Sequence, residues 1–120
     1  MPRILRFVLL TLFLLPCSAP VFAGEALWID VRSADEYAGN HVSIAHNIPY
    51  TEIADRISEL TDDKGAEIYV YCRSGRRSGI AKSTLEDMGF SKVVNLGGFK
   101  SAQQAAASMN ICPEANPQDC

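Results

Sequence analysis

Short apolar runs alternate with helical segments along this chain, and this alternation most constrains its fold. The strand-like runs cover residues 26–31, 45–48, 67–71 and 92–96, and they are rich in β-branched and aromatic side chains. Strands separated by helices imply right-handed crossovers, which place the strands parallel and the helices over them. The sequence therefore predicts an α/β domain with a mainly parallel sheet of four to five strands, flanked by helices on both faces.

The helical segments carry their own boundary signals. Ser33 and Glu36 have the spacing of a capping box, which opens a short helix directly after the first strand. The helix after the third strand is expected to begin near Ser78 and to end at Gly89, because glycine is the common residue at a helix C-terminus. Good helix formers over residues 100–109 predict the last helix.

The first 23 residues have the layout of a secretory signal peptide. A basic start precedes an apolar run at residues 7–15, and small residues end the segment at Ala23. The run is well short of the roughly 20 residues that span a membrane. We expect cleavage after Ala23, a periplasmic domain over residues 24–120, and no stable membrane insertion after cleavage. An uncleaved anchor is the alternative.

Charge and cysteine content narrow the function. The full chain has a formal net charge of −3, and the expected cleavage removes two arginines and no acid. A mildly acidic domain is a poor candidate for nucleic-acid binding. Cys72, Cys112 and Cys120 remain after cleavage. In an oxidising compartment, an odd number of cysteines leaves one thiol unpaired, which indicates that this thiol has a specific role.

Cys72 lies where the third strand turns into a helix, in a loop rich in glycine and arginine. Amides at a helix N-terminus have no helical partner, and Gly75 and Gly79 allow them to turn inward around an anion. The neighbouring cations are Arg73, Arg76 and Arg77. All of these features favour thiolate over thiol, so Cys72 is predicted to be a nucleophile with a lowered pKa. The alternative is a buried structural cysteine.

Three stretches resemble signatures of the rhodanese family. The N-terminal signature corresponds to WIDVR at residues 28–32, followed by Glu36-Tyr37, His41-Val42 and residues 47–49. The active-site loop corresponds to YVYCRSGRRS at residues 69–78, and the C-terminal signature to VNLGGF at residues 94–99. The order and spacing of the three fit nearly the whole mature chain. Together with the signal peptide, the sequence most resembles the small periplasmic single-domain rhodaneses of the phage-shock-protein-E type.

The resemblance implies a sulfurtransferase that needs no metal or organic cofactor. The Cys72 thiolate would attack the outer sulfur of thiosulfate or a similar small anionic donor, hold a persulfide, and pass the sulfur to cyanide or another thiophilic acceptor. The substrate-binding loop would comprise Arg73, Ser74, Gly75, Arg76, Arg77 and Ser78.

The resemblance also assigns residues outside the loop. Asp30 and Arg32 match an acidic and basic pair, which we interpret as structural support. His41 is expected to be a hydrogen-bonded structural histidine and His46 to be exposed. Ile44 stands where related sequences have a turn glycine, so the backbone there is expected to differ.

Two rival functions remain. A cysteine phosphatase or arsenate reductase would have arginine after five intervening residues, but Ser78 occupies that position. A persulfide carrier or docking module without turnover would use the same fold and the same cysteine.

The tail from about residue 110 is unlike that of the family. Its stretch CPEANPQDC has turn-forming residues between two cysteines, which predicts a Cys112–Cys120 disulfide that leaves Cys72 free. A Cys72–Cys112 pair is the alternative.

Overall fold

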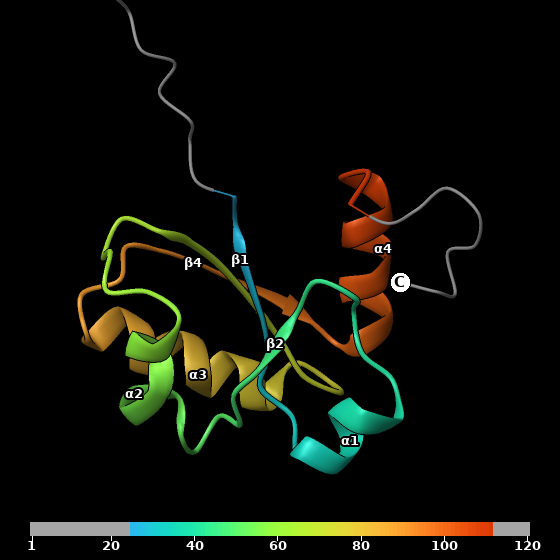
Figure 1. Ribbon diagram of the computed structural model, residues 1–120, viewed down its shortest axis with the longest axis horizontal. Coiled ribbons are helices and arrows are strands. Elements are labelled where there is room, and N and C mark those ends of the chain that lie inside the picture. Colours follow the sequence, from blue (N-terminus) through green and yellow to red (C-terminus); the bar gives the residue numbers. More distant parts are fainter. Residues whose placement is uncertain (1–24, 112–120) are drawn as a thin grey trace, which may run out of the picture.

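The computed structural model describes residues 25–111, and within them four strands form one parallel sheet (Figure 1). The sheet order is β2-β1-β3-β4. The elements in chain order are β1 (Leu27–Asp30), α1 (Ala34–Gly39), β2 (His46–Asn47), α2 (Ile53–Arg56), a 3₁₀ turn (Ile57–Glu59), β3 (Glu67–Tyr71), α3 (Arg76–Asp87), β4 (Lys92–Gly97) and α4 (Phe99–Ser108). The predicted α/β class and parallel sheet are confirmed.

Helices cover both faces of the sheet, as predicted (Figure 1). Successive side chains of a strand point to opposite faces. Along β3, Ile68 and Val70 therefore join the buried cluster that includes Leu85 of α3. Tyr71 instead joins the cluster on the other face, with Ala102 of α4. Burial on both faces explains why β3 is a continuous apolar run rather than an alternating one.

Ser33 caps the start of α1, as the predicted capping box requires of it. Ser33 is the N-cap residue, and its hydroxyl oxygen accepts a hydrogen bond from the backbone N–H of Glu36 at 3.3 Å. The same hydroxyl lies 3.2 Å from the Glu36 carboxylate, to which it can donate. These bonds fix the start of α1 and the position of the Glu36 side chain.

The predicted start of α3 was wrong by two residues. The helix begins at Arg76 rather than near Ser78, because Gly75 caps it with φ of 96°. Glycine populates this left-handed region freely, so the chain turns within one residue and the helix begins at once. Arg76, Arg77 and Ser78 are consequently residues of the first helical turn, not of a loop. The predicted end at Gly89 is confirmed, with φ of 101°.

Candidate active site

Cys72 directly follows β3, at the carboxyl edge of the sheet, and its side chain packs against the core under α3. The residue is only 1% exposed. Its sulfur nevertheless has polar neighbours: the backbone N–H of Gly75 donates to Sγ at 3.0 Å, and the Ser78 hydroxyl lies 3.4 Å away. The sulfur is therefore buried but surrounded by hydrogen-bond donors on the side of the α3 N-terminus.

These donors decide the charge of the thiol. Burial raises the pKa of Cys72, but hydrogen bonds from the Ser78 hydroxyl and from the amides of Ser78, Ser74 and Gly75 lower it further than burial raises it. The net pKa of Cys72 lies below its ordinary value. A buried thiol of this kind can carry negative charge without being exposed to solvent.

Asn95 of β4 organises the donors around Cys72. Its Oδ1 lies 2.7 Å from the Ser78 hydroxyl and accepts from the backbone N–H of Gly97 at 2.9 Å, while its Nδ2 donates to the carbonyl of Gly75 at 3.1 Å. The Ser78 hydroxyl has one proton, for which Asn95 Oδ1 and Cys72 Sγ compete. Asn95 thus positions both Ser78 and the loop turn. Asn95 lies within the VNLGGF signature, but no local pattern predicts its contact with Ser78.

The end of β4 also supports the loop through its backbone. The Cys72 N–H donates to the carbonyl of Gly97 at 3.1 Å. Gly98 lies so close that a Cβ there would be 2.7 Å from the carbonyl oxygen of Arg73. The cysteine loop therefore requires a residue without a side chain at position 98.

Gly98→Ala is predicted to lower the free energy of unfolding by about 1–3 kcal/mol and to slow sulfur transfer. The added methyl group can be accommodated only if β4 or the loop backbone shifts, and either shift would displace Cys72. Urea unfolding and the sulfur-transfer rate measure the two effects. Gly39→Ala is the matched control, since no atom lies within 4 Å of a Cβ built there. A stability change for Gly98→Ala no larger than that of the control would contradict the close approach.

The three arginines do not form a ring around the sulfur. Arg73 and Arg76 are exposed, but both terminal nitrogens of Arg77 donate to the Glu36 carboxylate, at 2.8 and 3.0 Å. Hydrogen bonds from Ser78 and from the loop amides are the largest causes that lower the pKa of Cys72. Arg77 therefore differs from Arg73 and Arg76 in being bound by a carboxylate.

Asp30 and Arg32 form a buried ion pair. The shortest contact joins Arg32 Nη2 and Asp30 Oδ2 at 2.7 Å, with the side chains 8% and 0% exposed. Arg32 also donates to the Asn40 carbonyl at 2.6 Å and lies over the ring of Phe99. The pair ties the end of β1 to the segment after α1 and to the start of α4.

The histidines and Ile44 lie away from the sulfur chemistry. His41 Nδ1 is 2.8 Å from the Tyr37 carbonyl, and the two rings stack with centroids 3.6 Å apart, as expected of a structural histidine. His46 is exposed, also as expected. In the described part of the chain, Asn110 is the only non-glycine residue with positive φ. Ile44 therefore fits this turn without the left-handed backbone that would need glycine.

Some predictions fall outside the described residues, namely the signal peptide at residues 1–23 and the Cys112–Cys120 disulfide. Over residues 25–111, no group of three potential metal-ligating side chains from His, Cys, Asp and Glu lies together. Within the same span, no helix combines the length and the apolar character needed to cross a membrane.

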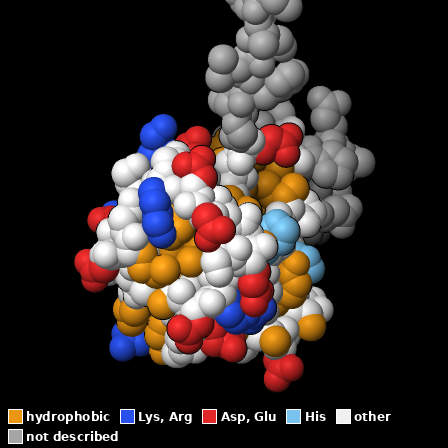
Figure 2. All heavy atoms as spheres, turned by 60° about the vertical axis from the view of Figure 1, so that its left-hand side comes forward, with side chains coloured by type: hydrophobic (Ala, Val, Ile, Leu, Met, Phe, Trp, Pro, Cys, Tyr) orange, Lys and Arg blue, Asp and Glu red, His pale blue; other side chains and the backbone are white. Residues whose placement is uncertain are grey.

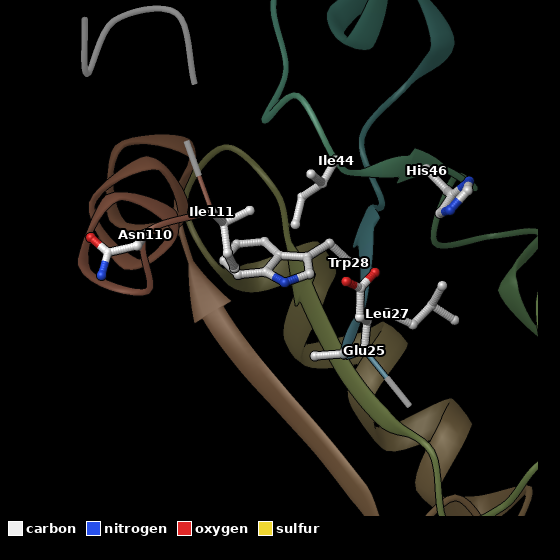
Figure 3. Close-up of a pocket in the computed structure, with 8 residues that line it drawn as sticks. Glu25, Leu27, Trp28, Ile44, His46, Asn110 and Ile111 are labelled. Carbon is white, nitrogen blue, oxygen red and sulfur yellow. The ribbon is translucent and has the colours of Figure 1, made fainter. Parts of the chain in front are cut away.

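A pocket of about 630 Å³ lies at the opposite end of the sheet from Cys72 (Figure 3). The residues that line it are Glu25, Ala26, Leu27, Trp28, Ile44, His46, Asn110 and Ile111. Leu27 pairs with Ile68 at the amino end of the parallel strands, whereas Cys72 follows their carboxyl ends. This lining offers no nucleophilic sulfur or hydroxyl group. The Cys72 loop is therefore the candidate active site, although it is not this pocket.

On the face in Figure 2, acidic and basic side chains are interspersed rather than gathered into one basic patch.

The rhodanese-like domain family matches residues 18–105 of this sequence, which includes β1, the cysteine loop and β4. This chain belongs to the rhodanese-like domain family. Its sequence is 48% identical over 83 residues to the thiosulfate sulfurtransferase PspE of Escherichia coli strain K12, over 69% of this rhodanese and 79% of PspE. A sulfurtransferase of Allochromatium vinosum is 35% identical over 74 residues, covering 62% of this chain and 67% of its own.

The solved structures agree with this assignment. A structure described as rhodanese with anions from E. coli superposes on this rhodanese with a TM-score of 0.62 and 44% sequence identity. The match covers 64% of this chain and 91% of that chain. The fold expected from the sequence resemblance is therefore shown.

Proposed function

We propose that this protein is a thiosulfate sulfurtransferase in which Cys72 carries the transferred sulfur. The observation that carries the proposal is the buried Cys72 sulfur with a lowered pKa, held by the Gly75 N–H and the Ser78 hydroxyl. Such a thiolate is a nucleophile already prepared for attack. The similarity to a thiosulfate sulfurtransferase supports the choice of donor.

The reaction balances in two steps. In the first, the Cys72 thiolate attacks the outer sulfur of thiosulfate. A new S–S bond forms, the bond between the two thiosulfate sulfurs breaks, and its electron pair leaves with sulfite. In the second step, cyanide or another thiophilic acceptor attacks the outer sulfur of the persulfide, and the electron pair of the S–S bond returns to Cys72 as thiolate.

The loop residues have distinct roles in this proposal. The amides of Ser74, Gly75 and Ser78 and the Ser78 hydroxyl hold negative charge on the sulfur in both states. Arg73 and Arg76 are exposed beside the loop and can attract a small anionic donor, so they bind substrate rather than activate the thiol. Asn95 positions Ser78 and Gly75.

The rival functions predict different kinetics. A cysteine phosphatase would hydrolyse p-nitrophenyl phosphate. A carrier would accept sulfur and release it to cyanide once, without turnover of thiosulfate. No contact in the site favours either rival. Ser78 occupies the position at which a phosphatase needs arginine, and its hydroxyl lies 3.4 Å from the Cys72 sulfur.

Steady-state rates with varied thiosulfate at several fixed cyanide concentrations test the proposal. A covalent intermediate released before the second substrate reacts gives double-displacement kinetics, with parallel lines in a double-reciprocal plot. Intersecting lines would indicate that donor and acceptor bind together, and would contradict the two-step route. Phosphate-ester hydrolysis in the same preparation would favour the phosphatase instead.

We also propose that the domain is exported to the periplasm with cleavage after Ala23, on the basis of the N-terminal sequence pattern. N-terminal sequencing of the protein from its native compartment should begin at Gly24. A full-length product retained in the membrane would support the anchor instead.

A further inference from the structure

One acidic side chain reaches the candidate active site from a distant part of the sequence. Glu36 of α1 accepts two hydrogen bonds from Arg77 of α3, and the two residues are 41 positions apart. Figure 1 shows α1 close to the turn that leads into α3. The bonded atoms lie 2.8 and 3.0 Å apart, and the side chains of Arg77 and Glu36 are 24% and 33% exposed, respectively. Glu36 therefore binds both terminal nitrogens of Arg77.

The Glu36 carboxylate is charged at any pH at which the enzyme would work. The hydrogen bond from Arg77 is the main cause that lowers the pKa of Glu36 to about 2, with further help from Ser33. Glu36 likewise raises the pKa of Arg77, and the Cys72 sulfur raises it as well. Glu36 is the group that holds the Arg77 guanidinium, through both of its terminal nitrogens. The remaining nearby acid is Asp30, which is bound by Arg32.

We propose that Glu36 sets the affinity for anionic sulfur donors by competing with the donor for Arg77. This inference rests on the proposed sulfur transfer at Cys72. Arginine binds oxyanions through pairs of parallel N–H bonds, and in this structure Glu36 takes the pair formed by the two terminal nitrogens of Arg77 and neutralises its charge. An incoming thiosulfate therefore meets a neutral Arg77–Glu36 pair, together with the exposed Arg73 and Arg76. Glu36 is thus a specificity-determining residue that does not touch the reacting sulfur.

Glu36→Gln tests this directly. Glutamine keeps the capping box of α1, because Glu and Gln serve equally at that position. The variant leaves Arg77 with an unpaired positive charge near Cys72. The KM for thiosulfate should fall about two- to fivefold, the size expected of partly exposed charges. The kcat should change little, an uncharged sulfur donor should show no gain, and added salt should reduce the difference.

Asp35→Asn is the matched control. Asp35 is the exposed neighbour of Glu36 on α1, and its substitution changes the net charge equally. We expect no change in the KM for thiosulfate. The double variant Glu36→Gln, Arg77→Gln should lose the gain, because the gain requires the released guanidinium.

The outcomes distinguish the competition for Arg77 from the proposed sulfur transfer at Cys72. An unchanged or raised KM in Glu36→Gln, or an equal fall in Asp35→Asn, would overturn the competition for Arg77 and leave the pair as a structural tie between α1 and α3. Failure of the proposed function would appear earlier, as the absence of thiosulfate turnover in the unchanged protein. Thermal unfolding of each variant verifies that it is folded, and Arg77→Gln alone, expected to raise the KM, gives a second measurement.

Discussion

Cys72→Ser should reduce sulfur transfer from thiosulfate to the background rate. The serine hydroxyl would receive the same hydrogen bonds from the loop, but its pKa is far too high for it to be charged near neutral pH, and it cannot form a persulfide. The change replaces one small buried group by another, so the variant should fold. Thiocyanate production measures the loss, and circular dichroism verifies the fold.

The remaining cysteines provide the control for this result. The double variant Cys112→Ser, Cys120→Ser retains Cys72 and should keep its turnover, since the proposed reaction needs a single thiol. Turnover that survives in Cys72→Ser, or that disappears in the double variant, would show that sulfur moves through another cysteine.

Asp30→Ala should lower the free energy of unfolding by about 3–5 kcal/mol, because it leaves the buried Arg32 guanidinium without its carboxylate. Both members of the pair are nearly inaccessible to solvent, and within residues 25–111 the Arg32 guanidinium would retain only the Asn40 carbonyl as a hydrogen-bond acceptor. Urea unfolding monitored by fluorescence measures the change.

An exposed ion pair is the control for that measurement. Lys82 and Glu86 lie 2.6 Å apart on the surface of α3, with side chains 39% and 47% exposed. Glu86→Ala should change the free energy of unfolding by less than about 1 kcal/mol. If Asp30→Ala destabilised the protein no more than Glu86→Ala, the pair would not support the end of β1.

Local signals predicted the fold well. The predicted third strand at residues 67–71 coincides with β3, because a short apolar run between a polar turn and a glycine-rich loop leaves little choice of ends. The strands β1 and β2 are shorter by a residue at each end than predicted. Glycine at position 89 also ended α3 as expected, since its left-handed backbone is a local preference.

The site was predicted less completely, because its geometry depends on distant residues. Spacing alone identified Cys72 and the donors that follow it. It could not show that Asn95 of β4 meets Ser78, or that Glu36 of α1 occupies Arg77, since both contacts depend on how strands and helices pack in space. The three arginines looked equivalent in the sequence, and only tertiary contacts distinguish Arg77.

The intact mass of the mature protein, measured before and after thiosulfate and again after cyanide, tests the central claim most directly. We predict that the protein gains one sulfur atom from thiosulfate, that cyanide removes this atom as thiocyanate, and that Cys72→Ser gains none. A folded wild-type protein that gains no sulfur, or a Cys72→Ser variant that gains one, would contradict the proposal that Cys72 carries the transferred sulfur.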